Sequence, residues 1–261
     1  MPELPEVETF KRYLDGTSLH QRITNVEVRD AYVLKSVSAR ELARRLKGRR
    51  FEHSHRHGKH LFVRIGDELW LRVHFGMTGS FEYLNRDDMP PKAARVIFHF
   101  ARSRLAFDDQ RKFGEIELIK DVDEFLQTRG LGPDALKISL SQFKAIVGKH
   151  RGAVKAILLN QRLIAGIGNL YADEILFRAR MHPASDPARL RDKDLMRLFR
   201  ATLCVLEKAI ALKTDFNRLP KSWLLTHREK RGRCPRCGCA LKSATIGGRT
   251  SWFCAHCQKR I

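Results

Sequence analysis

The stretch AGIGNLYADEILFRAR, residues 165–180, shows how the second half of the chain is organised. Gly166, Gly168 and Asn169 form a turn of small residues, and a run with helical periodicity begins directly after it. Glycines before a helix leave backbone N–H groups at its positive end, where a phosphate is bound well. The same small residues also suit a close packing corner between two helices. The pattern supports both interpretations.

Helical patterns lie on both sides of this turn. Segments 139–150 and 152–163 precede it as short helices, and the two cations around the start of the second one, Arg151 and Lys155, favour the phosphate interpretation. Residues 188–212 are typical of one long amphipathic helix, because apolar residues recur at helical spacing, in steps of three to five positions, at Leu190, Leu195, Leu198, Leu203, Leu206 and Ile210.

The first half of the chain has the alternation of β-strands instead. Apolar and polar residues alternate in the runs 25–34, 60–76, 94–109 and 113–119. These runs predict a mainly antiparallel β unit. The exception is the opening segment, where Val7, Phe10 and Leu14 lie at helical spacing and Gly16 is the expected stop. We therefore expect a helix before the strands.

Six cysteines are present, and four of them form two CxxC pairs sixteen residues apart. This spacing closes a tetrahedral zinc site on two tight turns, with the ligands Cys234, Cys237, Cys254 and Cys257. A site with four protein ligands has no open position, so the zinc is expected to hold the fold and do no chemistry. Cys204 and Cys239 lie outside the pattern and are expected to be inert thiols.

The balance of charge is strongly positive. The 261 residues contain 50 Lys and Arg against 29 Asp and Glu, a formal net charge of +21. Such a charge favours a polyanionic partner, most simply nucleic acid, over a merely solvated basic surface. From Lys221 onward, ten Lys or Arg accompany a single acid, Glu229, which points to phosphates. A zinc ribbon that binds protein is the alternative.

Neither a membrane span nor a secretory signal is expected. No run of eighteen apolar residues occurs, and the opening residues lack the basic and apolar blocks of a signal peptide. We expect an intracellular protein. The sequence has no heptad pattern, so a monomer is the default expectation.

Two loops that follow strands carry apolar and basic residues together. HFGMTGS (74–80) holds Met77 between glycines, and DDQRKFGE (108–115) holds Arg111 and Phe113. Such side chains can wedge into a base stack or bind an orphaned base edge. On the residues alone, however, inward packing is the favoured interpretation. A third segment, HSHRHGKH, is interpreted as a basic strand edge facing phosphate, in preference to a metal site.

Together these pieces resemble the bacterial family of formamidopyrimidine-DNA glycosylases and endonuclease VIII. The matching motifs cover almost the whole chain in the family's order: PELPEVET, HGKHL, HFGMTG, RKFGE, LGPDAL, AGIGNLYADEILF and CPRCG…GGRTSWFCAHCQ. PELPEVET is closer to the formamidopyrimidine branch. The resemblance implies an α+β multidomain fold. Its parts are an antiparallel β-sandwich with an N-terminal helix over 1–130, a helix–two-turns–helix domain over 131–220 and a zinc finger over 221–261. It implies one structural Zn²⁺ and damaged double-stranded DNA as the partner.

The resemblance also implies the chemistry. Once Met1 is removed, Pro2 carries a secondary α-amine, which is the family's nucleophile and forms a Schiff base with the sugar. An α-amine has a pKa near 8, so a useful fraction is neutral at physiological pH. Glu3 matches the acid that assists sugar-ring opening. Lys59 matches a catalytic lysine near the lesion's phosphate, and Arg249 matches the zinc-finger arginine that grips phosphate.

Further roles follow from the same resemblance. Met77, Arg111 and Phe113 match residues that fill the gap left by a flipped base, which places them outward. Further matches in the DNA-binding surface are His74, Arg151, Lys155 and Asn169.

The implied activity is that of a bifunctional DNA glycosylase and AP lyase of base excision repair. It removes oxidised purines, 8-oxoguanine and formamidopyrimidines, and cuts the strand by β,δ-elimination. One departure lies at residues 213–233, a short segment where the family carries a longer loop that covers extruded 8-oxoguanine. A preference for oxidised pyrimidines is therefore the alternative within the class, and a non-catalytic zinc-ribbon DNA-binding protein is the alternative outside it. The expected location is the bacterial cytoplasm, at the nucleoid.

Overall fold

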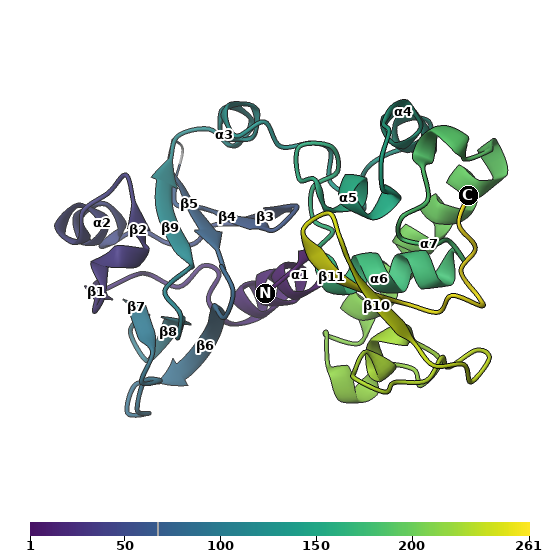
Figure 1. Cartoon of the computed structure of the whole chain (residues 1–261). Coiled ribbons are helices and arrows are strands. Elements are labelled where there is room, and N and C mark those ends of the chain that lie inside the picture. The colour runs from purple at the N-terminus through teal and green to yellow at the C-terminus, as the bar shows by residue number, and fades with distance from the viewer. Residues whose placement is uncertain (67) are drawn as a thin grey trace. The chain divides into compact units, whose positions relative to one another are not determined.

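A computed structural model describes residues 1–66 and 68–261, which separate into two units (Figure 1). The first unit contains Met1–Pro2 and Glu6–Gly130, and the second contains Glu3–Pro5 and Leu131–Ile261. Helix α1 (Leu4–Thr17) therefore begins in the second unit and continues in the first. Three residues at the start of the chain are held by the second unit, a point that matters for the site.

Two sheets form the first unit. The four-stranded sheet is antiparallel throughout, in the order β1 (Asn25–Val28), β7 (Ala94–His99), β8 (Ser103–Asp108) and β6 (Ser80–Asn85). The five-stranded sheet has a short β2 (Leu34–Lys35) parallel to β9 and is antiparallel elsewhere, in the order β2, β9 (Glu115–Ile119), β5 (Trp70–His74), β4 (His60–Arg64) and β3 (Ser54–His57).

One apolar core joins the two sheets. Phe98 and Phe107 from the four-stranded sheet share it with Leu61 and Val73 from the five-stranded sheet, and all four are fully buried. The alternation in the sequence explains this arrangement, because every second side chain of a strand faces the same layer. Val7 of α1 belongs to the same core. The antiparallel β-sandwich with its N-terminal helix is thus confirmed.

Differences from the expected elements are local. The run 25–34 is interrupted at Asp30, whose side chain accepts the Tyr32 N–H and caps a 3₁₀ turn. The run 60–76 divides into β4 and β5, and position 67 lies outside the described residues. Gly16 is not the stop of α1, because the helix includes it and ends at Thr17. Helices α2 (Ala39–Leu46) and α3 (Val122–Thr128) were not expected.

Helices pack around one core in the second unit. They are α4 (Leu140–Lys149), α5 (Val154–Leu159), α6 (Asn169–Arg178) and α7 (Asp192–Ala211). Helix α7 is shorter than the expected 188–212, because Pro187–Arg189 forms a separate 3₁₀ turn. Two further 3₁₀ turns, Phe216–Arg218 and Leu224–His227, follow α7.

The chain ends in a small hairpin module. Strands β10 (Lys242–Ile246) and β11 (Arg249–Phe253) pair antiparallel through a two-glycine turn. Gly247 and Gly248 have φ values of +59° and +71°, the left-handed conformations that a tight hairpin turn requires. None of the described helices is both long and apolar enough to cross a membrane.

Candidate functional site

Glu3 is buried at the start of α6, within the second unit. Its side chain is 1% exposed. Oε2 accepts the N–H groups of Gly168 at 2.7 Å and Tyr171 at 3.3 Å, and Oε1 accepts that of Leu170 at 2.8 Å. Such N–H groups have no partner within the helix, and the helix dipole adds to their attraction for a carboxylate. Charge-assisted hydrogen bonds therefore fix the third residue of the chain.

The two glycines of this turn make room for the N-terminal residues. A Cβ atom on Gly168 would lie 2.2 Å from Cδ of Glu3. Gly166 has a φ of +116°, and a Cβ there would lie 2.5 Å from Cδ1 of Leu4. The Leu4 N–H also donates to the Gly166 carbonyl at 3.0 Å. The turn thus has the shape of a seat for Glu3 and Leu4.

The α6 turn therefore binds an anion that the chain itself supplies. Of the two interpretations of this turn, the phosphate one needs free N–H groups, and three of these N–H groups donate to Glu3 instead. Asn169, the first residue of α6, keeps a buried Oδ1 atom without a hydrogen-bond partner in the described part of the chain. Its contact with DNA stays a prediction, as does that of the exposed Arg151.

Lys155 has a different environment from the one expected. Its side chain is fully buried, and Nζ donates to Asp173 Oδ1 at 2.6 Å, to Ser251 Oγ at 2.7 Å and to the Thr250 carbonyl at 3.3 Å. Burial lowers the pKa of the Lys155 ammonium, and the Asp173 carboxylate opposes that shift. The structure gives Lys155 a buried ion pair beneath the hairpin, which corrects the expectation of an ammonium open to phosphate.

Asp173 connects this ion pair to further segments. Its Oδ2 accepts Arg228 Nε at 2.8 Å and the Trp252 N–H at 3.1 Å. One carboxylate thus holds α5, the segment after α7 and strand β11 together. Arg249 begins that strand and is exposed beside the hairpin turn. The backbone that carries this side chain is anchored one and three residues further on, at the Thr250 carbonyl and the Trp252 N–H.

The four expected cysteines meet in one cluster. Their Sγ atoms lie within 4.8 Å of one another, with Cys234 and Cys257 3.9 Å apart and Cys237 and Cys254 3.5 Å apart. A tetrahedral zinc thiolate site with bonds of about 2.3 Å has sulfur–sulfur edges of about 3.8 Å, so the cluster fits Zn²⁺. One structural zinc is confirmed. Cys239 is exposed beside Cys237 and stands outside the four-thiolate set.

The segment between α7 and the first cysteine is packed rather than extended. Trp223 and Leu224 are buried, and the Leu225 N–H donates to Glu174 Oε2 of α6 at 3.0 Å. Burial raises the pKa of Glu174 to about 7. The Arg178 guanidinium lies 5.3 Å from the Trp223 ring centroid. These contacts hold the segment against α6.

In the first unit, Lys59 lies in the turn between β3 and β4 and is 8% exposed. The turn is tied to α1, because Arg56 donates to the Gly58 carbonyl at 3.1 Å and to Glu8 Oε2 at 3.0 Å. No group of three metal ligands includes the histidines of this segment in the described ranges. A basic strand edge describes the segment better than a metal site does.

Two histidines beside this turn are held neutral. Burial, together with the nearby Arg72 and Lys59 cations, lowers the pKa of His74 to about 4. Burial also lowers the pKa of His60 well below its usual value, and Arg72 Nη1 lies 3.2 Å from His60 Nδ1. The Gly76 N–H lies 3.2 Å from His74 Nδ1 and donates to it. At neutral pH His74 is therefore an uncharged support of the next loop.

The two loops with apolar residues lie together and point outward. Met77 is 37% exposed and Phe113 is 52% exposed. The Arg111 guanidinium lies 4.9 Å from the Phe113 ring centroid. Buried Asp109 joins the loops by accepting Thr78 Oγ1 at 2.6 Å. Inward packing was wrong for Met77 and Phe113, and their action on a base stack stays a prediction.

The sequence did not reveal three buried acids that bind donors far along the chain. Asp109, Asp173 and Glu174 each organise a loop or segment, yet none was singled out. The only local signal was an unusual acid, in DDQ after a strand and in ADE within an apolar helix. Each acid is buried and accepts at least one hydrogen bond from a donor more than thirty positions away, and such pairing leaves no periodic pattern.

Family models match the chain in three blocks. The formamidopyrimidine-DNA glycosylase N-terminal domain matches residues 1–116, the H2TH domain of these enzymes matches 130–219, and a zinc finger found in FPG and IleRS matches 232–260. The fold and the cysteine cluster agree with these matches. The protein is thus a DNA glycosylase that combines a helix–two-turns–helix domain with a zinc finger.

Individual relatives agree over the full length. The formamidopyrimidine-DNA glycosylase of Streptococcus pneumoniae R6 is 33% identical over 100% of both chains, and that of Pelotomaculum thermopropionicum is 32% identical over 99% of both. The Lactococcus lactis enzyme, solved with DNA that contains an abasic site, has a TM-score of 0.89 at 29% identity, covering 99% of this chain and 100% of that one. The chain belongs to the formamidopyrimidine-DNA glycosylase family.

Proposed function

We propose that this glycosylase also acts as an AP lyase, through a Schiff base on Pro2, on oxidised purines in double-stranded DNA. Removal of Met1 frees the secondary amine of Pro2. An amine with a pKa near 8 is partly neutral at physiological pH and is therefore a competent nucleophile.

The proposed reaction has five steps. The Pro2 nitrogen bonds to C1′ of the deoxyribose, and the C1′–base bond breaks with its electron pair on the base, which takes up a proton. The nitrogen then loses its proton and the ring oxygen gains one, so that breakage of the C1′–O4′ bond leaves an iminium, in which the nitrogen carries the positive charge. Loss of a C2′ proton expels the 3′ phosphate, and loss of the C4′ proton in a second elimination expels the 5′ phosphate. Water then hydrolyses the iminium and releases Pro2.

The seat of Glu3 is the observation that carries this proposal. Three N–H groups of the α6 turn hold its carboxylate, and Pro2 is the preceding residue, about 3.8 Å away from Cα to Cα. Such an anchor reduces the freedom of the nucleophile, which is the entropic part of catalysis by positioning. We assign Glu3 the proton transfer at the sugar ring oxygen.

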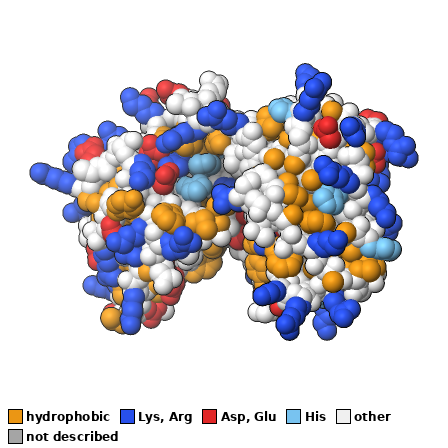
Figure 2. All heavy atoms as spheres, in the orientation of Figure 1, with side chains coloured by type: hydrophobic (Ala, Val, Ile, Leu, Met, Phe, Trp, Pro, Cys, Tyr) orange, Lys and Arg blue, Asp and Glu red, His pale blue; other side chains and the backbone are white. Residues whose placement is uncertain are grey.

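Phosphate binding is assigned to cations on separate elements. Lys59 comes from the β3–β4 turn, Arg249 from the β10–β11 hairpin and Arg151 from the loop before α5. Figure 2 shows Lys and Arg side chains spread over the visible face, with acidic side chains less frequent. Asn169 adds an amide at the start of α6. We assign Met77, Arg111 and Phe113 to the space left by a flipped base, with His74 as a support.

Oxidised purines are the favoured substrates because of the relatives. The Lactococcus lactis enzyme has been solved with DNA that contains Fapy-dG, with a TM-score of 0.90 at 29% identity. The packed segment 213–233 leaves a preference for oxidised pyrimidines as the second candidate, because Trp223 and Leu224 direct it into the core. We further propose that the enzyme acts as a monomer at the bacterial chromosome.

Borohydride trapping on an abasic-site duplex tests the mechanism. The wild-type protein should give a covalent protein–DNA adduct, and Pro2→Gly or a short N-terminal extension should reduce it by at least about a hundredfold. The same extension at the C-terminus is the matched control and should leave trapping unchanged. Absence of an adduct with wild-type protein of verified N-terminus would refute the mechanism.

Excision from two duplexes distinguishes a preference for oxidised purines from a preference for oxidised pyrimidines. Single-turnover excision is measured on 8-oxoguanine opposite cytosine and on thymine glycol opposite adenine. Purine preference predicts the faster rate on the first duplex by at least tenfold. The reverse order would establish the pyrimidine alternative and leave the Schiff-base mechanism intact.

A further inference from the structure

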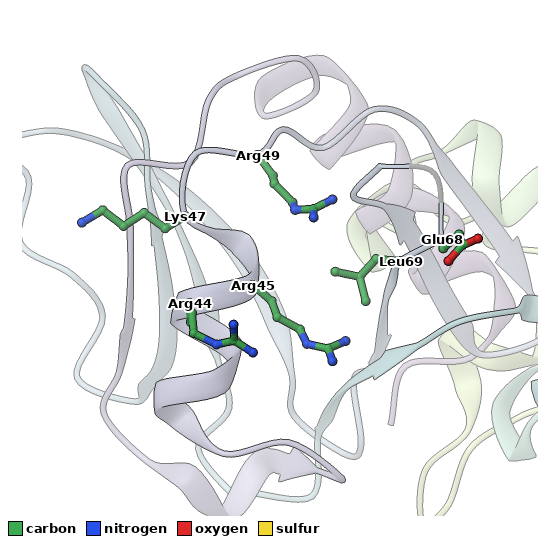
Figure 3. Close-up of a pocket in the computed structure, with 6 residues that line it drawn as sticks. All are labelled: Arg44, Arg45, Lys47, Arg49, Glu68 and Leu69. Carbon is green, nitrogen blue, oxygen red and sulfur yellow. The ribbon is translucent and has the colours of Figure 1, made fainter.

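The segment 40–50 concentrates positive charge in the first unit. It holds six Lys or Arg and one acid, whereas residues 1–130 as a whole have 24 Lys and Arg against 20 Asp and Glu. Four of these cations line a hollow of about 840 Å³ together with Glu68 and Leu69. We call these four residues the α2 patch: Arg44, Arg45, Lys47 and Arg49 (Figure 3).

Among the described residues, one carboxylate forms ion pairs with these cations. Glu41 accepts Arg44 Nη2 at 2.8 Å and Arg45 Nε at 2.6 Å. Lys47 and Arg49 form no ion pair within residues 1–66 and 68–261, and both are exposed. The Arg49 side chain is held in place by a hydrogen bond, in which its Nη1 donates to the Ile65 carbonyl at 3.2 Å. The patch therefore presents a net excess of cations.

Two of the four side chains, Arg45 and Arg49, converge on the hollow. Figure 3 shows Arg45 and Arg49 extending toward Leu69, while the carboxylate of Glu68 points away from them. Lys47 extends in a different direction from the end of α2. Guanidinium groups bind phosphate oxygens in a bidentate manner, so Arg45 and Arg49 suit phosphate groups, with Lys47 as a separate point charge.

We propose that the α2 patch binds the backbone phosphates of a DNA segment other than the one in the catalytic site. The proposal rests on the proposed function insofar as duplex DNA is the substrate. An acidic protein is the less suitable partner, because protein interfaces depend on buried apolar anchors. The exposed large apolar residues among those described include none from 40–50.

The α2 patch lies away from Lys59 in the β3–β4 turn, within the first unit. Lys59 precedes strand β4, and the hollow residues Glu68 and Leu69 follow it. The five residues of β4 span about 17 Å at about 3.4 Å each. The α2 patch and Lys59 therefore cannot hold the same phosphate. Contact with a second DNA segment would keep the enzyme on long DNA while it searches.

A competition experiment isolates this contact. The protein is first saturated with a short duplex that carries an abasic-site analogue, and a fluorescent undamaged duplex of about 40 base pairs is then titrated at low salt. The wild-type complex should bind this second duplex. The variant Arg45→Gln/Lys47→Gln/Arg49→Gln should bind it about tenfold more weakly, with a salt slope lower by roughly 2 to 3, since each phosphate contact contributes about 0.9.

The control removes equal charge elsewhere. Arg86, Lys92 and Arg102 are exposed on other loops of the first unit, and the variant Arg86→Gln/Lys92→Gln/Arg102→Gln should behave as wild type. Equal affinity of the patch variant and wild type would overturn the proposal, as would equal losses for the short and the second duplex. Binding of an acidic protein in place of DNA would also overturn it. Failure of the short duplex to bind would instead count against the proposed function.

Discussion

Asp173 joins three segments of the second unit through one carboxylate. Asp173→Asn keeps one acceptor but leaves the fully buried Lys155 ammonium without a counter-charge. Removing one partner of a buried pair costs about 3 to 5 kcal/mol. We therefore predict a loss of this size in the free energy of unfolding, measured by denaturant titration. Zinc content should stay unchanged, because all four cysteines remain.

A double-mutant cycle supplies the control for Asp173. Lys155→Met removes the orphaned charge, so Asp173→Asn/Lys155→Met should be more stable than Asp173→Asn alone. Strict additivity of the two single variants would mean that the ion pair does not connect the segments. In DNA titrations the single variant should also bind more weakly, because the backbone behind Arg249 loses the Asp173 anchor.

His74 predicts a pH dependence of stability in the first unit. Its pKa is about 4 in the folded protein and about 6.5 in an unfolded chain. Between these values the unfolded state binds more protons, so the free energy of unfolding falls as the pH decreases from 6.5 to 4. We expect a loss on the order of 2 kcal/mol from this group, given its partial exposure.

The measurement for His74 is the melting temperature at pH 7.5 and pH 5. His74→Gln removes the titrating ring and retains an acceptor for the Gly76 N–H, so the acid-induced decrease should be smaller than in wild type. The exposed His53→Gln is the control and should leave the decrease unchanged. An unaltered pH response in His74→Gln would contradict the assignment.

At the scale of elements, the α6 turn makes the sharpest prediction. Gly168 has ordinary extended angles, so alanine is excluded there only by Glu3, whose Cδ would lie 2.2 Å from the new Cβ. Gly168→Ala should displace Glu3 and, with it, the nucleophile. We expect borohydride trapping to fall by at least about a hundredfold, with a destabilisation of roughly 1 to 3 kcal/mol.

Gly148→Ala is the matched control for this turn. A Cβ on Gly148 would lie 3.6 Å from Leu195 Cδ1, an ordinary contact inside α4. That variant should trap DNA normally and be more stable by up to about 1 kcal/mol, because alanine favours the helix. Normal trapping by Gly168→Ala would show that the seat of Glu3 does not position Pro2.

Local sequence patterns predicted most helices and strands, but they did not predict the long-range contacts that the side chains of these elements make. Alternation revealed the strands, because one face of each lies in the core. Helix α2 escaped notice since only Leu42 and Leu46 of its residues are buried, and its clearest signal is the cap on Ser38. The seat of Glu3 joins residues about 165 positions apart, and Lys155 finds Ser251 across 96 positions. Pairs so far apart leave no periodic pattern in the sequence. Glu3 and Lys155 were therefore identified as site residues, but their hydrogen-bond partners were not predicted.

For the whole molecule, charge is unequally divided. Residues 131–261 carry 26 Lys and Arg against 9 Asp and Glu, compared with 24 against 20 in residues 1–130. Most of the non-specific attraction to a polyanion should therefore come from the second half, because exposed cations release counterions when they meet phosphates. The zinc module carries part of that charge on a fold with a small core of its own, shared with Phe177 and Leu224.

Removal of the zinc should therefore weaken DNA binding while the sandwich stays folded. The four thiolates are the closing element of the module, so a chelator is expected to unfold residues 232–260 and to open the buried pair beneath β11. We predict release of one zinc per chain, new protease cleavage in this range and at least tenfold weaker DNA binding with a shallower salt slope. Proteolysis of the first unit should not change, and added Zn²⁺ should restore binding where Mg²⁺ does not. If the zinc-free protein kept both its protease resistance and its salt slope, the metal would not organise this DNA-binding module.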